Sequence, residues 1–362
     1  MKLDTVQLQN FRNIAKTTIE PARALTLIYG RNGSGKSSLL ESIYYLGFGR
    51  SFRTKRHRSV IQHDADAFSV FARCTAESNE RFHVGLSRGE GNQFTCSING
   101  NHSRRLADLV SLLPIQLFTP QSTDLILGSP SERRRFIDWG LFHVEQSFHS
   151  LSGQYQKLLR HRNALLKQQA NLSAPQHQFW EQQFIELGNA LTTIREDYVE
   201  KLTSHFARFA TEFLPEFSVS LSYYKGWEKD ASLLESLVKK REYDGKIGHS
   251  SVGPHKADIR LRIDGVSAQE ILSRGQLRMA VAALQLAQTS LFTHLSERKS
   301  IFLLDDVGAE LDSDKRERFI DGLLNMDTQV FVTAIEKSQL EFIQKYKDKK
   351  MFHVEHGNVK EE

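Results

Sequence analysis

The pattern of hydrophobic and polar positions changes twice along this chain of 362 residues. In the first third, short apolar or alternating runs rich in β-branched and aromatic residues predict β-strands. These runs cover residues 3–8, 24–29, 68–74, 81–86, 94–98 and 115–118. The first part of the chain is therefore expected to form a lobe of mixed strands.

From residue 131 the apolar positions recur at helical spacing. One series consists of Phe148, Leu151, Tyr155, Leu158 and Leu165, and a second of Trp180, Phe184, Leu187, Leu191, Ile194 and Tyr198. A polar break at residues 171–175 separates them. The pattern predicts two antiparallel helices of about 35 to 40 residues each, projecting on the order of 50 Å. An ordinary helical subdomain packed on the core is the alternative.

The last third returns to strands, at residues 217–223 and 257–263. A helix over 275–291, a strand over 300–304, a helix over 312–324 and a strand over 329–333 then alternate as in a parallel sheet. We therefore predict an α/β fold with a mixed β lobe, a parallel-sheet core and an inserted α-helical hairpin. Residues 1–120 and 250–362 would form a composite head, and residues 121–249 a helical arm.

The composition excludes several classes of protein but does not indicate a function. The formal net charge is a mild +5, and the two cysteines, Cys74 and Cys96, lie in separate strand-like runs. Neither a disulfide framework nor a zinc site is indicated, and both thiols are expected to be buried packing. No run approaches the roughly 20 apolar residues of a membrane span, and the first residues lack a signal-peptide pattern. A cytoplasmic protein with no membrane partner is expected.

A candidate binding loop lies between the strand at 24–29 and a helix that begins at Lys36. The intervening residues, with the start of the helix, are Gly30, Arg31, Asn32, Gly33, Ser34, Gly35, Lys36, Ser37 and Ser38. This is a phosphate-binding loop: its glycines let main-chain NH groups surround phosphates, and the helix N-terminus adds partial positive charge. Lys36 would hold the outer phosphates and Ser37 would offer its hydroxyl to Mg²⁺. The sequence thus predicts ATP and Mg²⁺ as cofactors.

A second part of the same site is expected about 240 residues further on. The apolar strand at 301–304 ends in Asp305 and Asp306. Because a buried parallel strand delivers its last side chains to the ligand-binding edge of the sheet, Asp305 is predicted to contact the magnesium. Asp306 is predicted to orient the attacking water as the catalytic carboxylate, together with Lys36. Acids that merely cap a turn are the alternative.

Residues 272–276 read Leu-Ser-Arg-Gly-Gln and open a helix. They resemble the signature sequence of the ABC-type ATPases, and residues 308–312 resemble that superfamily's D-loop. The resemblance implies an ABC-type ATPase head in which Ser273, Gly275 and Gln276 of one subunit contact the ATP of another. It therefore implies a homodimer that forms on ATP binding. A serine that only caps its helix is the alternative.

Longer blocks at residues 8–13, 47–53, 128–138 and 252–258 resemble the RecF family of bacterial recombination-repair ATPases, which is similar to SMC heads but has a short arm. The resemblance implies a weak, DNA-stimulated ATPase that binds gapped DNA at double-strand to single-strand junctions. It also implies cooperation with RecR and RecO in loading the recombinase. Arg12 and Asn13 would contact nucleotide, and Gln121 would serve the Q-loop in catalysis and metal binding, with Gln116 as the other choice.

Positive residues bunch in two runs that are candidate DNA contacts. The first comprises Arg50, Arg53, Lys55, Arg56 and Arg58, and the second Arg133, Arg134 and Arg135. Without a base-reading motif, contacts would be to phosphates and independent of sequence. A solvated charged surface would explain such runs equally well.

Two positions depart from the general ABC pattern. Residues 332–335 read Val-Thr-Ala-Ile where transporter heads have a switch histidine, and Asp306 stands where many relatives have glutamate. Slow hydrolysis is therefore expected. An ATP-dependent structural clamp in which hydrolysis is incidental stays as an alternative function. A transporter subunit is disfavoured by the helical hairpin, and an SMC-type chromosome organiser would need a longer coiled coil.

Overall fold

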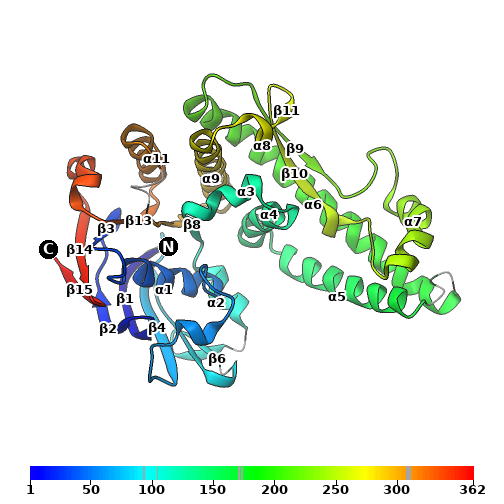
Figure 1. Ribbon diagram of the computed structural model, residues 1–362. Coiled ribbons are helices and arrows are strands. Elements are labelled where there is room, and N and C mark those ends of the chain that lie inside the picture. The colour runs from blue at the N-terminus through cyan, green and yellow to red at the C-terminus, as the bar shows by residue number, and fades with distance from the viewer. Residues whose placement is uncertain (93, 104, 170–171, 173, 307–310) are drawn as a thin grey trace. The chain divides into compact units, whose positions relative to one another are not determined.

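The computed structural model describes residues 1–362 except 93, 104, 170–171, 173 and 307–310 (Figure 1). The chain divides into two compact units. The head unit consists of Met1–Ser122 and Phe292–Glu362, and the helical unit consists of Thr123–Leu291.

The head unit contains two six-stranded sheets. The first is antiparallel, with strand order β2-β1-β4-β5-β6-β7. Its strands are β1 (Lys2–Phe11), β2 (Ile14–Ile19), β4 (Ala67–Thr75), β5 (Arg81–Gly89), β6 (Phe94–Ile98) and β7 (Asn101–Ser103). Buried positions alternate with half-buried or exposed ones along β4, as expected of a sheet with one face packed on the core. Cys74 and Cys96 are free and buried on this sheet, which confirms their predicted packing role.

The second sheet of the head unit has the order β15-β14-β3-β13-β12-β8 and is parallel except for its last hairpin. Its strands are β3 (Leu25–Tyr29), β8 (Ile115–Phe118), β12 (Ile301–Leu304), β13 (Gln329–Ala334), β14 (Lys349–Glu355) and β15 (Asn358–Glu361). All residues of β12 and β13 are buried, because helices cover parallel sheets on both faces. The sheet confirms the expected parallel core and adds the β14–β15 hairpin, which was not predicted.

Helix α1 (Lys36–Phe48) joins the two sheets in one hydrophobic core. Its Leu39, Leu40 and Ile43 are fully buried in a cluster that also holds side chains of both sheets, such as Val70 and Phe331. The described part of the head unit also contains the helices α2 (Leu106–Leu112) and α11 (Ser313–Asn325), with 3-10 turns between strands. Because α1 is packed on several sides, its N-terminus is held rigidly at the carboxyl edge of β3.

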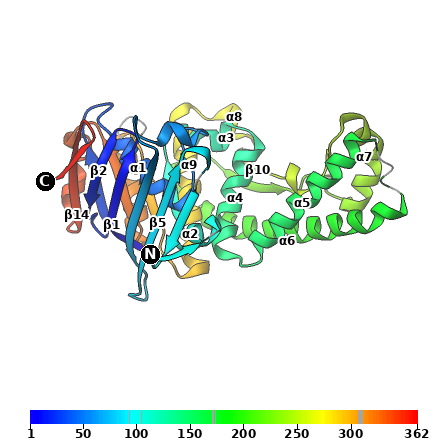
Figure 2. The ribbon, with the colours of Figure 1, turned by 90° about the horizontal axis from the view of Figure 1, so that it is seen from below.

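The helical unit is built on the long helix α6 (Pro175–Phe213), and α5 (Phe148–Lys167) runs alongside it in both views (Figures 1 and 2). Its described residues also form the helices α3 (Asp124–Leu127), α4 (Pro130–Val144), α7 (Leu233–Ile247), α8 (Ala268–Ile271) and most of α9 (Arg274–Ser296). A three-stranded sheet of order β11-β10-β9 completes it, formed by β9 (Val219–Tyr224), β10 (Asp258–Ile263) and β11 (Val266–Ser267).

The predicted hairpin is correct in its second helix but too long in its first. α6 has 39 residues, whereas the first helix is split into α4 and the 20-residue α5. The Glu145 carboxylate accepts hydrogen bonds from the NH and the hydroxyl of Ser147, which stabilises the turn between them. At 1.5 Å per residue α5 spans about 30 Å, rather than the expected 50 Å.

The predicted boundary at residue 250 also differs from the structure. Residues 250–291 belong to the helical unit, and the head resumes at Phe292. The reason is strand pairing: β10 pairs antiparallel with β9 of the helical unit instead of joining the parallel sheet. The turn predicted at Asp264-Gly265 is present, with positive φ at both residues (49° and 85°), and it connects β10 to β11. None of the helices formed by the described residues combines the length and the hydropathy of a membrane-spanning segment.

Candidate nucleotide-binding site

A pocket of about 460 Å³ lies in the head unit where β3, β12 and β13 end. It is lined by Arg12, Asn13, Asn32, Gly33, Gly35, Lys36, Ser37, Ser38, Arg53, Ser59, Ile61, Asp305, Asp306 and Thr333. The two predicted halves of the nucleotide site, the phosphate loop and the acids after residue 304, therefore share one cavity. Their meeting follows from the sheet order, because β3 and β12 both flank β13.

The loop before α1 needs its glycines. Gly30 and Gly35 have φ of 152° and 122°, and Gly33 has φ of 78°. At Gly30 a Cβ atom would lie 2.2 Å from the main-chain oxygen of Val354, so no larger residue fits. The loop therefore has the tight turns and close main-chain approach that the motif requires.

Lys36 folds back over the phosphate loop. Its Nζ donates to the carbonyl oxygens of Gly30 (2.6 Å) and Arg31 (3.0 Å). Burial lowers the pKa of Lys36, and the nearby Asp306 and Asp305 only partly oppose that shift. The ammonium group is thus held at the pocket by weak carbonyl partners, which an anionic ligand could replace.

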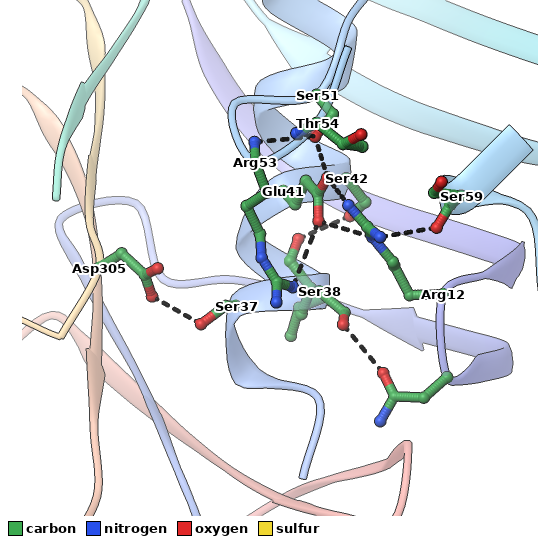
Figure 3. Close-up of polar contacts among 12 residues, drawn as sticks. Arg12, Ser37, Ser38, Glu41, Ser42, Ser51, Arg53, Thr54, Ser59 and Asp305 are labelled. Atoms are coloured by element: carbon green, nitrogen blue, oxygen red, sulfur yellow. Dashed lines mark hydrogen bonds and ion pairs between the residues drawn. The ribbon is translucent and has the colours of Figure 1, made fainter. Parts of the chain in front are cut away.

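Ser37 and Asp305 meet although 268 positions separate them in the sequence (Figure 3). The Ser37 hydroxyl donates to Oδ1 of Asp305 at 3.0 Å, and the Thr333 hydroxyl donates to the same oxygen at 2.9 Å. Asp305 is only 8% exposed, and burial raises the pKa of its carboxyl group. A hydroxyl and a carboxylate facing one pocket are the hard oxygen ligands that Mg²⁺ prefers, so this pair fits the predicted metal role.

Asp306 lies in a left-handed conformation with φ of 51°. Its NH donates to the Thr333 hydroxyl at 2.8 Å, and the residue lines the pocket. Such a backbone conformation is uncommon for residues other than glycine and persists where the surroundings impose it, often at functional sites. Thr333 therefore fixes both acids at once, from the end of β13.

Thr333 was not predicted as a site residue. A signal was available, since a hydroxyl group inside a fully buried parallel strand needs a polar partner. That partner is the pair of acids after β12.

Arg12 is beside the pocket, but its guanidinium group is engaged elsewhere. It makes two hydrogen bonds to Glu41 (3.0 and 2.7 Å) and one to the carbonyl oxygen of Ser59 (2.6 Å) (Figure 3). Glu41 lies on α1 with no exposed surface, and Arg53 is a second, more distant cation at 3.6 Å. Glu41 was not predicted, although an acid on a strongly apolar helix is a recognisable signal.

Asn13 supports the phosphate loop directly. Its Nδ2 donates to the carbonyl oxygen of Ser34 at 3.1 Å, and its Oδ1 accepts from the Ser38 hydroxyl at 2.9 Å. Asn13 thus joins the end of β1 to both sides of the loop, which accounts for its place in the pocket without a ligand.

The predicted Q-loop residue is not brought to this pocket. Gln121 is exposed in the 3-10 turn Pro120–Thr123, and the alternative Gln116 is buried within β8. Neither is among the residues that line the cavity. The turn follows the edge strand β8, which is separated from β3 by β12 and β13, and this distance in the sheet explains the difference.

The two basic runs have different surroundings. All five residues of the first run are exposed. Arg58 also pairs with Glu90 at 2.6 Å, and Arg53 lines the nucleotide pocket. These residues follow α1 in an irregular segment with one 3-10 turn, His57–Val60.

In the second run, Arg133 and Arg134 make internal contacts, and their expected DNA-binding role stays a prediction. Arg133 pairs with Asp258 at 2.7 Å and also donates to two carbonyl oxygens, while Arg134 donates to the carbonyl oxygen of Ala257. Arg135 is exposed but bonds to Glu132. Successive residues of a helix point about 100° apart, so three arginines on α4 cannot share one surface.

The signature-like residues lie in the helical unit, at the start of α9. The NH of Ser273 donates to Oε1 of Gln276 at 2.9 Å, and the NH of Gln276 donates to the Ser273 hydroxyl at 3.4 Å. This reciprocal arrangement is a capping box. Ser273, Arg274 and Gly275 are exposed, so a contact with a ligand stays a prediction. The D-loop resemblance at 308–312 falls largely outside the described residues; Asp312 caps α11 by accepting from the NH of Lys315.

Similarity to known proteins covers nearly the whole chain. Residues 2–360 match the family described as RecF/RecN/SMC N terminal domain. A protein of Pseudoalteromonas atlantica named DNA replication and repair protein RecF is 54% identical over 100% of both chains. A protein of the same name from Shewanella woodyi is 40% identical over 99% of this chain and 98% of its own.

Solved structures agree. The structure described as the recombination mediator protein RecF-ATP in the RecFOR pathway has a TM-score of 0.89 at 26% identity, covering 100% of this chain and 97% of that one. A structure described as the Smc head bound to the C-winged helix domain of ScpA has a TM-score of 0.61 at 16% identity, covering 100% of this chain and 97% of that one. At this identity it shows likeness of fold alone. The fold is therefore the expected ABC-type ATPase head with a helical insertion, and the chain belongs to the RecF family.

Proposed function

We propose that this protein is an ATP-dependent DNA-binding protein of recombinational repair and replication-fork maintenance, whose dimer forms when ATP binds and is reset by slow hydrolysis. The observation that carries the proposal is the meeting of Lys36, Ser37 and Asp305 in one pocket of the head unit. The repair context comes from the names of the relatives, which are DNA replication and repair proteins.

Each residue of the pocket has a role that its chemistry supports. The phosphate loop and Lys36 would bind the triphosphate, and Ser37 with Asp305 would hold its magnesium ion, which neutralises phosphate charge when bound. Asp306 would orient a water molecule beside the terminal phosphate. Thr333 would act as a positioning residue, because its hydroxyl bonds to the carboxylate of Asp305 and to the NH of Asp306.

The exposed cap of α9 supports a dimer. Ser273, Gly275 and Gln276 would face the ATP held by a second copy, so that two nucleotides lie between two heads. A ligand that contacts both subunits stabilises the pair by its differential affinity, and its hydrolysis removes that stabilisation. ATP would therefore control how long the protein stays on DNA.

DNA is proposed to contact the exposed Arg50, Lys55 and Arg56 through its phosphates. The preferred DNA would be gapped duplex, and RecR and RecO would be partners in loading the recombinase. These details are carried by family resemblance and by the RecFOR context of the solved relative. No base-reading contact is proposed, so affinity should fall with salt and vary little with sequence.

The first experiment is molecular mass by light scattering, with and without ATP, magnesium and gapped duplex DNA. Asp306→Asn would slow hydrolysis, and Lys36→Ala would serve as the variant that cannot hold the phosphates. We expect a dimer for Asp306→Asn only with ATP, retained on DNA, and a monomer for Lys36→Ala under all conditions. A monomer that binds DNA regardless of nucleotide would refute the dimer switch.

A structural clamp in which hydrolysis is incidental is the second candidate. It is favoured by Asp306, whose side chain is one methylene shorter than that of glutamate and whose backbone is in the left-handed conformation. Both features bear on how well its carboxylate can orient a water molecule for hydrolysis. Repair activity in cells separates the two: Asp306→Asn should be inactive if hydrolysis times the cycle, and active if ATP binding alone suffices.

A further inference from the structure

The helical unit has a pocket of about 540 Å³ that shares no lining residue with the nucleotide pocket. One wall is a continuous stretch of β10, residues 258–262, and the rest comes mainly from α3, β11 and α8. Apolar side chains contribute much of the lining, including Leu125, Ile126, Leu221, Leu261 and Leu284. The volume lies in the range of ordinary ligand pockets.

The wall formed by β10 is an unpaired strand edge. On one side β10 pairs with β9 along its whole length, but β11 on the other side pairs only with Arg262 and Ile263. The NH of Asp264 donates to the carbonyl oxygen of Ser218, which fixes the alternation of hydrogen bonds with β9. By that alternation, the NH and C=O groups of Ile259 and Leu261 point away from β9, toward the open edge. No main-chain partner for them on that side occurs among the residues that the structure describes.

The segments that border the pocket also expose large apolar side chains. Leu127, the last residue of α3, is 48% exposed, Val266 of β11 is 40% exposed, and Ile271 of α8 is 45% exposed. α3 and α8 are neighbours in the fold, and Figure 1 shows both beside β10 and β11 in this unit. Exposed apolar groups of this kind around a groove are typical of a protein-binding surface.

The charged side chains around the groove indicate what kind of segment could bind there. Asp258 is already paired with Arg133, whereas Arg260 and Arg262 are exposed on the same strand. Arg260 stacks over Tyr224 at 4.4 Å, and Glu270 is the exposed acid of the lining. The rim is therefore net positive, which favours a segment carrying carboxylates.

We propose that this groove binds an extended, acidic segment of a partner protein, which adds as a further strand to the open edge of β10. Main-chain groups of Ile259 and Leu261 supply hydrogen bonds, the pocket receives alternate apolar side chains, and Arg260 and Arg262 attract the intervening acids. An open strand edge selects an extended chain over a helix, because only an extended chain presents NH and C=O groups at matching spacing.

The test uses the full-length protein and a labelled heptapeptide in which valine and leucine alternate with glutamate. Binding is followed by fluorescence anisotropy, and protection of the β10 amides by hydrogen exchange. The protein variant is Val266→Glu at the groove. Its matched control is Val238→Glu on α7, where the valine is 53% exposed and no residue of α7 lines the groove. A second peptide carries N-methyl groups on the amides that would pair with β10.

We expect saturable binding, protection at Ile259 and Leu261, and at least about tenfold weaker binding both for Val266→Glu and for the methylated peptide. Val238→Glu should bind like the parent protein. Absence of binding up to about 1 mM peptide, or equal binding of the methylated peptide, would overturn the proposal. Self-association of the protein alone that Val266→Glu abolishes would overturn the choice of occupant, in favour of a second copy of this chain.

Discussion

Lys36 and Asp305 in the head unit face the same pocket without forming an ion pair, whereas Arg133 and Asp258 in the helical unit bond to each other at 2.7 Å. Burial lowers the pKa of Lys36 and raises that of Asp305, so each is less favourably charged than it would be in water. In the helical unit, arginine and carboxylate neutralise each other. The charges of Lys36 and Asp305 are therefore available to a bound ligand, whereas the ion pair of Arg133 and Asp258 stabilises the fold.

The contrast shows that charge patterns alone do not separate function from structure. Arg133 lies in a run of three arginines that invites a nucleic-acid interpretation, yet its contacts are internal. Asp305 follows a strand, where an aspartate often only stabilises a turn, yet its carboxylate is buried. Burial of this charge destabilises the folded state unless a cation binds. Removing a charge should therefore have opposite effects on the stability of the two units.

The three tryptophans of the chain provide a probe of one unit. Trp139, Trp180 and Trp227 all lie in the helical unit, so tryptophan fluorescence reports the unfolding of that unit alone.

The largest loss is expected for Arg133→Ala. The substitution leaves the Asp258 carboxylate, which is only 16% exposed, without its partner, and should lower the free energy of unfolding of the helical unit by about 3 kcal/mol. Urea unfolding followed by tryptophan fluorescence measures the change. Arg135→Ala is the matched control: its arginine is 56% exposed beside Glu132, and a change within about 0.5 kcal/mol is expected. Equal effects at the two positions would remove the distinction between buried and exposed arginines.

A pH effect of similar size is expected from His255, which bonds to the Tyr155 hydroxyl at 2.7 Å and to the carbonyl oxygen of Ser250 at 3.0 Å. Burial, with the nearby cations Lys256, Arg134 and Arg162, lowers the pKa of His255 from 6.5 to about 4. The unfolded chain therefore binds a proton at a pH where the folded chain does not. This contribution is complete above pH 6.5 and falls by about 3 kcal/mol as the pH approaches 4.

The measurement for His255 is urea unfolding by tryptophan fluorescence across this range, for the parent protein and His255→Gln. Because glutamine does not titrate, the difference in stability between the two proteins should shrink as the pH falls. A constant difference would mean that the folded protein admits the protonated histidine.

A gain in stability is expected for Asp305→Asn in the absence of nucleotide. The amide keeps oxygen for the Ser37 and Thr333 hydroxyls but removes a buried charge, so the head unit should gain about 1 kcal/mol near neutral pH. The raised pKa of Asp305 means that the gain disappears at low pH, where the carboxyl group of the parent protein is protonated too. Calorimetry of the head transition checks this, and ATP with magnesium should reverse the order of stability. A loss of stability without nucleotide would refute the picture of an uncompensated charge.

The smallest effect on stability is expected for the combined change Arg50→Ala, Lys55→Ala and Arg56→Ala, because all three side chains are exposed. Unfolding should change by less than about 0.5 kcal/mol. DNA affinity, however, should fall, and the slope of log affinity against log salt should decrease by about 2 to 3. Titrations of gapped duplex at several salt concentrations provide the slope. An unchanged slope would place the DNA elsewhere.

The sequence by itself determined the local features of the head. The phosphate loop, the strand before it and the acids after residue 304 are each defined by a few consecutive residues, so glycine spacing and apolar runs suffice to predict them. The parallel core was predicted for the same reason. The β14–β15 hairpin was not, because its strands carry several lysines and glutamates and only Phe352 and Val354 of β14 are fully buried.

Tertiary structure decided what those features contact. Thr333 is a site residue only because β13 lies beside β12, and Glu41 matters only because Arg12 reaches it from the end of β1. The boundary at Phe292 depends on β10 choosing β9 as its partner, and the internal role of Arg133 depends on α4 lying against β10. These outcomes are set by pairings between residues far apart in the chain, whose energies no local pattern of hydrophobic and polar positions contains.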